Sequence, residues 1–271
     1  MQVARTIRGA REAVAVARRA EGGTLGLVPT MGALHAGHRA LLDAARAECS
    51  TVVMSLFVNP AQFGETADLE AYPRDEPHDL AAAEAAGVDV VFAPSATELY
   101  PPGFATWVDP GPLATTMEGA HRPGHFRGVA TIVLKLLHIV APDAAYFGQK
   151  DAQQVAVIRS VLRDLDLPVL LRVVPTVRDR DGLAFSSRNE RLSPAERAQA
   201  LALPRALATR DRAAALAILR AAGLEPDYVE VADLEPRVLA AAVRVGSTRL
   251  IDNVILEPAH VEAPPAMDHP V

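Results

Sequence analysis

Several residue types are scarce in this sequence, and each shortage narrows what the chain can do. Its 271 residues include one cysteine, Cys49, which excludes an internal disulfide and suits a reducing cytoplasm. No run approaches the roughly 18 consecutive apolar residues of a membrane span. The formal net charge of −6 argues against a nucleic acid bound through its phosphates. We therefore expect a cytoplasmic globular protein with neither a membrane nor a nucleic-acid partner.

Lysine is the second shortage. Lys and Arg together number 27, yet only Lys135 and Lys150 are lysines. An ammonium is a compact point charge on a flexible stem, whereas a guanidinium is a planar fork, so a lysine in such a chain is a candidate for a special role. Lys150 stands in a Gly-Gln-Lys-Asp turn, which favours a function. Lys135 stands in an apolar segment, where we expect its stem to pack along the surface and its charge to reach water.

Three familiar catalytic signatures are also missing. The sequence has no Gly-x-Gly-x-x-Gly dinucleotide fingerprint, no Gly-x4-Gly-Lys-Ser/Thr phosphate loop and no Gly-x-Ser-x-Gly nucleophile elbow. Cys49 stands at the end of a predicted helix without an evident base. These absences argue against dehydrogenases, P-loop ATPases and enzymes that use a covalent nucleophile.

The first part of the chain alternates predicted strands with predicted helices. Hydrophobic patterning places strands at 24–30, 51–58, 88–93, 144–147 and 169–174, and helices at 38–49, 75–86, 128–140 and 155–165. Residues 1–20 lack the apolar segment of a signal peptide and favour a surface helix. This order predicts an α/β fold, with residues 1–177 forming a Rossmann-like parallel-sheet domain covered by helices on both faces.

The pattern changes after about residue 178. Residues 194–222 are rich in alanine and predict helix in two pieces around Pro204, and strands follow at 228–232 and within 237–256, with Gly246 and Ser247 as a turn. We expect residues 178–271 to form a smaller α+β lid domain, with a hinge at residues 179–182 and a loose tail at 258–271.

One motif has the form of a phosphate cradle. His35-Ala36-Gly37-His38 follows an apolar strand and opens a predicted helix, so both rings point to one side. The free N–H groups and the positive end of a helix attract an anion, and Gly32 and Gly37 let a phosphate approach the backbone. The pair could instead be ordinary loop histidines, but the place between strand and helix favours a phosphate site.

Two further strings add cations and hydroxyls. Phe147-Gly148-Gln149-Lys150-Asp151 follows a short strand, so Lys150 can reach phosphate oxygens and Asp151 a ribose hydroxyl. Gln154 stands one helical turn later, over the same cleft. Ser186-Ser187-Arg188 offers hydroxyl and guanidinium donors and, just past the predicted hinge, suggests a lid over a polyphosphate.

Other polar residues are candidates for holding a small acid. Asn59 and Gln62 follow the predicted strand at 51–58, although an ordinary Asn-Pro turn explains them equally well. Arg122 stands in a loop dense in histidine and glycine, which could equally be a solvated loop. His121 and His125 could join His35 and His38 around zinc, but no Cys or carboxylate ligands stand at suitable spacing. Magnesium carried by nucleotide phosphates fits better.

These strings together form an ordered set that resembles a known family. The set comprises Pro-Thr-Met-Gly-Ala-Leu-His, Phe-Val-Asn-Pro-x-Gln-Phe, Tyr-Pro-Arg, Arg-Pro-Gly-His-Phe, Phe-Gly-x-Lys-Asp-x-Gln-Gln and Ser-Ser-Arg-Asn, and it runs from about residue 27 to 189. The chain resembles the pantothenate synthetase (pantoate–β-alanine ligase) family of the nucleotidyltransferase superfamily. His-x-Gly-His alone indicates the superfamily, whereas the full ordered set is specific to the family.

The resemblance implies an ATP-dependent ligase that joins pantoate to β-alanine in two stages. Pantoate's carboxylate would attack the α-phosphorus of ATP and release pyrophosphate, and the amine of β-alanine would then attack the pantoyl adenylate and release AMP. Both nucleophiles would come from the substrates, which fits a protein that offers none. The resemblance also implies a homodimer and a magnesium requirement.

The resemblance further assigns roles to individual residues. His38 would serve as proton donor and phosphate ligand, Gln62 and Gln154 would hold pantoate, and Gln62 would also lie near β-alanine. Lys150 and Arg188 would neutralise charge on the phosphates. The ATP pocket would be lined by Met31, Gly32, Ala33, Leu34, His35, Ala36, Gly37, His38, Gly148, Gln149, Lys150, Asp151, Val177, Phe185, Ser186, Ser187 and Arg188.

Two other functions stay open at this level. Another His-x-Gly-His nucleotidyltransferase would move a whole nucleotide onto a phosphate-bearing substrate, and its pocket should hold arginines for that second phosphate. The neutral amides of Gln62 and Gln154 suit a small diol better. A non-catalytic nucleotide sensor would bind ATP but release no pyrophosphate with pantoate.

Overall fold

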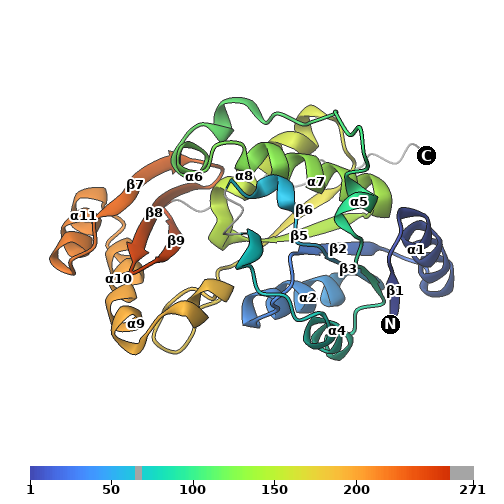
Figure 1. The fold of residues 1–271 in the computed structure, drawn as a ribbon, viewed down its shortest axis with the longest axis horizontal. Coiled ribbons are helices and arrows are strands. Elements are labelled where there is room, and N and C mark those ends of the chain that lie inside the picture. Colours follow the sequence, from blue (N-terminus) through green and yellow to red (C-terminus); the bar gives the residue numbers. More distant parts are fainter. Residues whose placement is uncertain (65–68, 257–271) are drawn as a thin grey trace, which may run out of the picture.

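The computed structural model describes residues 1–64 and 69–256 and shows two lobes of unequal size (Figure 1). The predicted tail at 258–271 lies outside the described residues. Among these residues, no helix combines the length and apolar character needed to cross a bilayer.

The larger lobe is built on a six-stranded sheet whose strands all run parallel. The order across the sheet is β1-β4-β3-β2-β5-β6. The strands are β1 (Gln2–Ala4), β2 (Leu25–Thr30), β3 (Thr51–Leu56), β4 (Val90–Phe92), β5 (Ala144–Gly148) and β6 (Leu170–Val174). From β2 the chain proceeds outward through β3 to β4, which pairs with the edge strand β1, and then restarts at β5 on the other side of β2. Ligands of such sheets bind where the order reverses, beyond the carboxyl ends of the two central strands.

Helices cover both faces of this sheet, as predicted for a Rossmann-like fold. One face carries α1 (Ile7–Glu21), α7 (His125–Val140) and α8 (Ala152–Asp164), and the other carries α2 (Ala36–Glu48) and α4 (Glu76–Ala85). The alternation within β2 divides its side chains between two cores: Leu25 and Leu27 pack under α1 and α7, and Val28 packs under α2. Short elements join these layers: α5 (Ala96–Leu99), α6 (Met117–His121) and the 3-10 turns η1 (Pro60–Gln62), η2 (Gly111–Ala114) and η3 (Gln149–Asp151).

The smaller lobe is an antiparallel sheet backed by helices, which confirms the predicted α+β character. Its strands are β7 (Pro226–Asp233), β8 (Arg237–Val245) and β9 (Thr248–Ile255), in that order, and the turn between β8 and β9 is at Gly246 and Ser247 as predicted. The segment at 194–222 forms three helices, not two: α9 (Pro194–Ala200), α10 (Ala202–Ala208) and α11 (Arg212–Ala221). Pro204 does not mark a break, because it occupies the first turn of α10, where no backbone N–H is needed.

Both faces of the smaller sheet are covered, which explains why β8 is almost entirely apolar. Leu239 and Ala241 of β8 join the core with α10 and α11. The alternate residues Ala240 and Ala242 pack instead against α8 of the larger lobe, in a cluster with Ala152. The smaller lobe therefore has an apolar contact with the larger one, and this contact includes Ala152, the residue that follows η3.

A polar contact reinforces the junction. Glu118 of α6 accepts hydrogen bonds from the Tyr228 hydroxyl at 2.9 Å and from Arg249 at 2.6 Å. Arg249 also pairs with Asp227 at 2.6 Å. Because Glu118 is buried, the pairing compensates a charge that has been taken out of water.

Candidate active site

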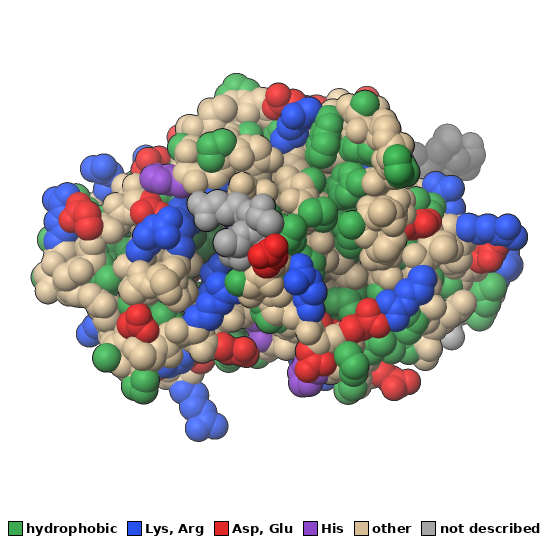
Figure 2. All heavy atoms as spheres, in the orientation of Figure 1, with side chains coloured by type: hydrophobic (Ala, Val, Ile, Leu, Met, Phe, Trp, Pro, Cys, Tyr) green, Lys and Arg blue, Asp and Glu red, His purple; other side chains and the backbone are tan. Residues whose placement is uncertain are grey.

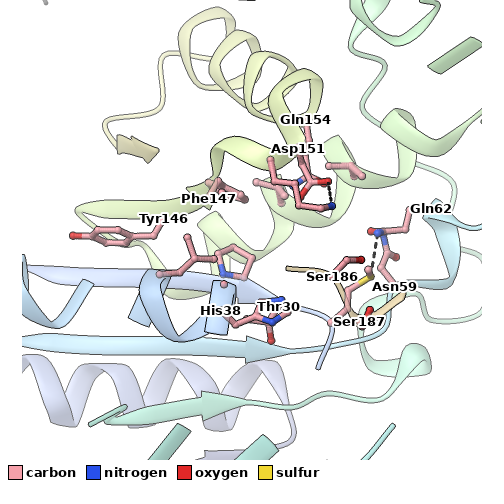
Figure 3. Close-up of a pocket in the computed structure, with 18 of the residues that line it drawn as sticks. Thr30, His38, Asn59, Gln62, Tyr146, Phe147, Asp151, Gln154, Ser186 and Ser187 are labelled. Atoms are coloured by element: carbon pink, nitrogen blue, oxygen red, sulfur yellow. Dashed lines mark hydrogen bonds and ion pairs between the residues drawn. The ribbon is translucent and has the colours of Figure 1, made fainter. Parts of the chain in front are cut away.

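One cavity collects most of the residues that the sequence singled out. It is lined from β2 and α2, from the turn after β5, and from residues 174–177 and 185–188. Of the predicted site residues, the lining includes Met31, His35, Gly37, His38, Asn59, Gln62, Arg122, Gly148, Lys150, Asp151, Gln154, Val177, Phe185, Ser186, Ser187 and Arg188. Gly32, Ala33, Leu34, Ala36 and Gln149 do not line it. In Figure 3, Asp151 and Gln154 lie above the cavity and Thr30 and His38 below it.

His35 and His38 form a close pair at the N-terminus of α2. Their ring centroids are 4.1 Å apart. The Gly37 N–H donates to His35 Nδ1 at 3.1 Å, and the His35 N–H donates to His38 Nδ1 at 3.3 Å. A neutral imidazole whose Nδ1 accepts must carry its proton on Nε2. Both rings therefore keep an Nε2–H donor, which an anion can accept.

The surroundings keep both rings neutral. Burial, followed by the positive charge of Lys150, lowers the pKa of His35 to about 4. Burial, followed by His35 and then Lys150, lowers the pKa of His38 to about 3. In the absence of a ligand, each imidazole is thus a neutral hydrogen-bond donor at physiological pH. The Lys150 ammonium lines the same cavity as the pair.

Gly37 is required for a reason that the sequence did not reveal. A Cβ at this position would lie 2.9 Å from Cε1 and 3.0 Å from Nδ1 of His35. The glycine therefore makes room for the histidine ring as well as for a ligand. The ring of Phe185 stacks on that of His35, with the two centroids 6.1 Å apart.

Asp79 shapes the loop before the histidines and was not predicted. This side chain of α4 is 1% exposed and accepts the N–H groups of Ala33 at 3.0 Å and Leu34 at 2.8 Å. Gly32 has a φ of 83°, and a Cβ there would lie 2.7 Å from the Asp79 carboxylate. Gly32, Ala33 and Leu34 thus build the turn without facing the cavity. The contact spans 46 residues, so no local pattern indicates it.

The Lys150 turn is held from the smaller lobe. Asn253 of β9 donates from Nδ2 to the carbonyls of Gln149 and Lys150, both at 2.9 Å, and accepts from Gln149 Nε2 at 3.0 Å. This explains why the Gln149 side chain is buried away from the cavity. The Lys150 ammonium lies 3.8 Å from the Asp151 carboxylate within the cavity lining.

The Ser186–Arg188 segment completes the cationic side of the cavity. Ser186 Oγ accepts the Arg188 N–H at 3.2 Å. Tyr72 is another lining residue, and burial raises the pKa of its phenol. The predicted hinge at residues 179–182 is tied to neighbouring elements: Arg197 pairs with Asp179 and Asp181, and Arg178 pairs with Asp252 at 2.6 Å. Whether the segment bends stays a prediction.

The cavity also contains amides and an apolar wall. Gln62 and Asn59 come from η1 and the residue before it, and Figure 3 shows them on the same side as Ser186 and Ser187. Arg122 donates to the Gln62 carbonyl at 3.3 Å, and His125 donates from Nδ1 to the same oxygen at 2.9 Å. The apolar wall consists of Phe57, Val129, Ile132, Val133 and Leu136.

The four histidines do not form a metal site. His35 and His38 face each other, His125 is bonded to Gln62, and His121 lies against the Tyr228 ring with centroids 6.0 Å apart. Within residues 1–64 and 69–256, no three His, Cys, Asp or Glu side chains gather as metal ligands.

Lys135 places its ammonium 4.8 Å from the Phe104 ring centroid, so it reaches aromatic faces.

Sequence reasoning missed several lining residues besides the loop contacts of Asp79. Tyr146, Thr176 and Pro175 line the cavity at the ends of β5 and β6, near Val177. Tyr146 lies within an apolar strand and reads as core, and its hydroxyl lies 3.3 Å from Cys49 Sγ. For Pro175 and Thr176, the position just after a parallel strand is the one sequence signal that indicates them.

Basic side chains are prominent on one face of the molecule. Figure 2 shows several of them, in blue, on the middle part of this face, with an acidic side chain among them. Basic groups of this kind attract an anionic ligand locally, although the net charge of the whole chain is −6.

Comparison with known proteins agrees with this geometry. A family profile described as pantoate-beta-alanine ligase matches residues 2–255. The pantothenate synthetase of Roseiflexus castenholzii is 55% identical over 265 residues, covering 89% of this chain and 95% of that protein. That of Corynebacterium glutamicum is 51% identical over 261 residues, covering 86% and 94%.

Solved structures show the same similarity in three dimensions. The pantothenate synthetase of Thermus thermophilus has a TM-score of 0.88 at 44% identity, covering 95% of this chain and 100% of that one. The pantoate-beta-alanine ligase of Francisella tularensis, solved in complex with beta-gamma ATP and beta-alanine, has a TM-score of 0.84 at 33% identity, covering 96% and 99%.

Proposed function

The chain belongs to the pantoate–β-alanine ligase family, and from this premise we propose how its cavity carries out the reaction. The enzyme is an ATP-dependent ligase that forms a carbon–nitrogen bond between pantoate and β-alanine. One carboxylate oxygen of pantoate bonds to the α-phosphorus of ATP while the bond to the β-phosphate oxygen breaks. The amine of β-alanine then bonds to the acyl carbon, a proton is lost, and AMP leaves.

A single observation supports this assignment most strongly. The paired imidazoles of His35 and His38, the ammonium of Lys150 and the donors of Ser186–Arg188 share one cavity with the Gln62 amide. Positive groups, hydrogen-bond donors, neutral amides and apolar side chains thus line a single cavity. This combination suits a triphosphate beside a small diol acid.

The phosphate-facing groups would act by positioning and by stabilising charge. Lys150 and Arg188 would neutralise the negative charge that builds on the α-phosphate and the departing pyrophosphate. His35 and His38 would donate from Nε2 to phosphate oxygens. Because His38 is neutral without ligand, a proton-donor role for it would require the bound polyphosphate to raise its pKa, as a nearby anion does.

The amides and the apolar wall would hold pantoate. Pantoate carries a carboxylate, hydroxyls and geminal methyl groups. Gln62 and Gln154 would bind its oxygens, with Arg122 beside them, and the methyl groups would pack against the wall that includes Val133 and Leu136. Membership of the pantoate–β-alanine ligase family argues against a nucleotidyltransferase for phosphorylated substrates.

Magnesium would be carried mainly by the phosphate oxygens of ATP. Asp151 is the only carboxylate among the described residues that line the cavity, and one carboxylate together with phosphates is a common magnesium environment. When bound, the ion would draw negative charge from the phosphates.

We further propose a cytoplasmic homodimer with a domain boundary at residues 177–178.

The experiment that tests the function is pyrophosphate release in the presence of magnesium. We expect ATP and pantoate together to release it without β-alanine, and continuous turnover to require β-alanine. ATP binding without release would identify a nucleotide sensor. Release only with a phosphate-bearing acceptor would identify the other kind of nucleotidyltransferase.

A further inference from the structure

The side chain of Asn59 has every hydrogen-bonding position occupied within the protein. Its Oδ1 accepts from the Ala61 N–H at 3.3 Å and from the Tyr100 hydroxyl at 2.8 Å. Its Nδ2 donates to the Gly128 carbonyl at 3.2 Å and to Gln62 Oε1 at 3.0 Å. A carboxamide has two donors and two acceptor sites, so none is left for a substrate. Asn59 lines the cavity but is 1% exposed.

Two backbone groups fix which way the Asn59 amide faces. The Ala61 N–H can only donate, and the Gly128 carbonyl can only accept. A reversed amide would set nitrogen against an N–H and oxygen against a carbonyl, and both hydrogen bonds would be lost. The two main-chain partners and the Tyr100 hydroxyl, which donates to Oδ1, therefore favour the same orientation of Asn59.

Asn59 in turn fixes Gln62. Because Asn59 presents an N–H, the side chain of Gln62 must turn its oxygen toward Asn59, and its Nε2 is left toward the cavity. That nitrogen lies 3.0 Å from Met31 Sδ, which is a weak acceptor. Figure 3 shows Gln62 and Asn59 side by side at this end of the cavity. Gln62 thus offers a donor, and a ligand atom that takes the place of the sulfur must be an acceptor.

Gly128 permits this arrangement. A Cβ on Gly128 would lie 2.2 Å from the Ala61 carbonyl oxygen and 2.8 Å from the Gln62 nitrogen. Any side chain there would push α7 away from η1, and the Gly128 carbonyl would no longer reach Asn59.

Tyr100 is held outside the cavity with its hydroxyl aimed at Asn59. Its ring packs against Phe104 at 5.0 Å and Trp107 at 6.1 Å between centroids. Burial raises the pKa of the phenol to about 12, so the hydroxyl stays protonated and remains a donor. The Lys135 ammonium lies over the Tyr100 ring, 5.9 Å from its centroid.

We propose that Tyr100 and Asn59 are positioning residues that fix Gln62 as a hydrogen-bond donor and so make the pantoate end select an acceptor oxygen. The proposal rests on the proposed function, since it assumes that Gln62 binds pantoate. Neither residue touches the reacting atoms; both act through Gln62.

The test is the variant Tyr100→Phe, which removes one of the two donors to Asn59 and keeps the ring. We expect pantoate to bind about 3–10-fold more weakly, by calorimetry with a non-hydrolysable ATP analogue present, while the KM for ATP changes less than about twofold. Tyr228→Phe is the matched control. It removes another buried hydroxyl, bonded to Glu118 outside this end of the cavity, and should leave pantoate binding unchanged.

A double-mutant cycle separates positioning from a general loss of structure. If Tyr100 acts through Gln62, Tyr100→Phe should have almost no further effect on pantoate binding in a Gln62→Ala background. Unchanged binding in the single variant, or an equal loss in both backgrounds, would overturn the proposal. Failure of the proposed function is distinguishable, because the unmodified protein would then release no pyrophosphate with pantoate.

Discussion

The side-chain amide of Asn253 donates a hydrogen bond to the backbone carbonyl of Lys150 at 2.9 Å. The donor belongs to the sheet of the smaller lobe, and the acceptor belongs to the turn that carries the cavity's lysine. Asn253 is 4% exposed and also bonds to the main chain and side chain of Gln149. The smaller lobe therefore holds the turn that carries a cation of the cavity.

Asn253→Ala should weaken both the fold and ATP binding. It leaves two buried carbonyls and the Gln149 amide without partners, which should lower the free energy of unfolding by about 1–3 kcal/mol. The KM for ATP should rise, because the Lys150 turn loses its support. Gln199→Ala is the control: this amide bonds to the Ala222 carbonyl away from the cavity, so its loss should leave that KM unchanged. Equal KM values for all three proteins would contradict the positioning role.

Lys150→Arg should be harmful although the charge is kept. A planar fork on a different stem cannot place its charge where the compact ammonium lies, so we expect kcat/KM for ATP to fall by about 10–100-fold, or roughly 1.4–2.7 kcal/mol. The matched control is the chain's other lysine: Lys135→Arg, against the Phe104 ring, should have near-normal kinetics. A Lys150→Arg enzyme with the original rate would show that only charge matters there.

His38→Ala should slow adenylate formation while the fold survives. Removal of a group that donates to the phosphates should lower the single-turnover rate of pyrophosphate release by about 10²–10⁴-fold. His138→Ala, on the exposed side of α7, is the control and should keep the rate. The role assigned to His38 is wrong if a folded variant turns over normally.

The neutral histidines predict a pH dependence of stability. Burial is the main cause that lowers the pKa of His35 to about 4, His38 to about 3 and His125 to about 4. An unfolded histidine titrates near 6.5, so between about pH 6.5 and 4 the unfolded chain binds more protons and stability falls as the pH is lowered. Above about pH 6.5 these histidines are neutral in both the folded and the unfolded chain, so this loss of stability disappears.

Urea unfolding at about pH 5.0, 5.5, 6.0 and 7.0 would measure this effect. The pH values are chosen above the range where most carboxylates titrate, so the histidines dominate the slope. His125→Asn should reduce the slope between about pH 6.5 and 5, whatever it does to absolute stability. An unchanged slope in that variant would mean that His125 is not held neutral.

The sequence predicted the fold class and most of the cavity for a physical reason. The strings around His35, Lys150 and Arg188 follow strands or the segment after them, and parallel strands bring their carboxyl ends to one edge of the sheet. Local pattern was therefore enough to anticipate that these groups meet. The short strand β1 was not predicted, because three residues are too few to show a hydrophobic alternation.

Contacts between distant segments could not be predicted in this way. Asp79 holds the loop before the histidines, and Asn253 holds the Lys150 turn from 103 residues away in sequence. The hydrogen bonds of Asn59 with Tyr100 and Gly128 also join distant segments, 41 and 69 residues away in sequence. Each of these contacts depends on which polar groups the folded chain brings together, and the periodicity of the sequence does not predict that.

The central claim is that pantoate's carboxylate displaces pyrophosphate from the α-phosphorus within this cavity. The most direct measurement follows ¹⁸O placed in the pantoate carboxylate through one complete reaction with ATP and β-alanine. The account predicts that one labelled oxygen appears in the phosphate of AMP, because the carboxylate–phosphorus bond survives when the amine takes the acyl group. AMP without label, or label in pyrophosphate, would contradict it.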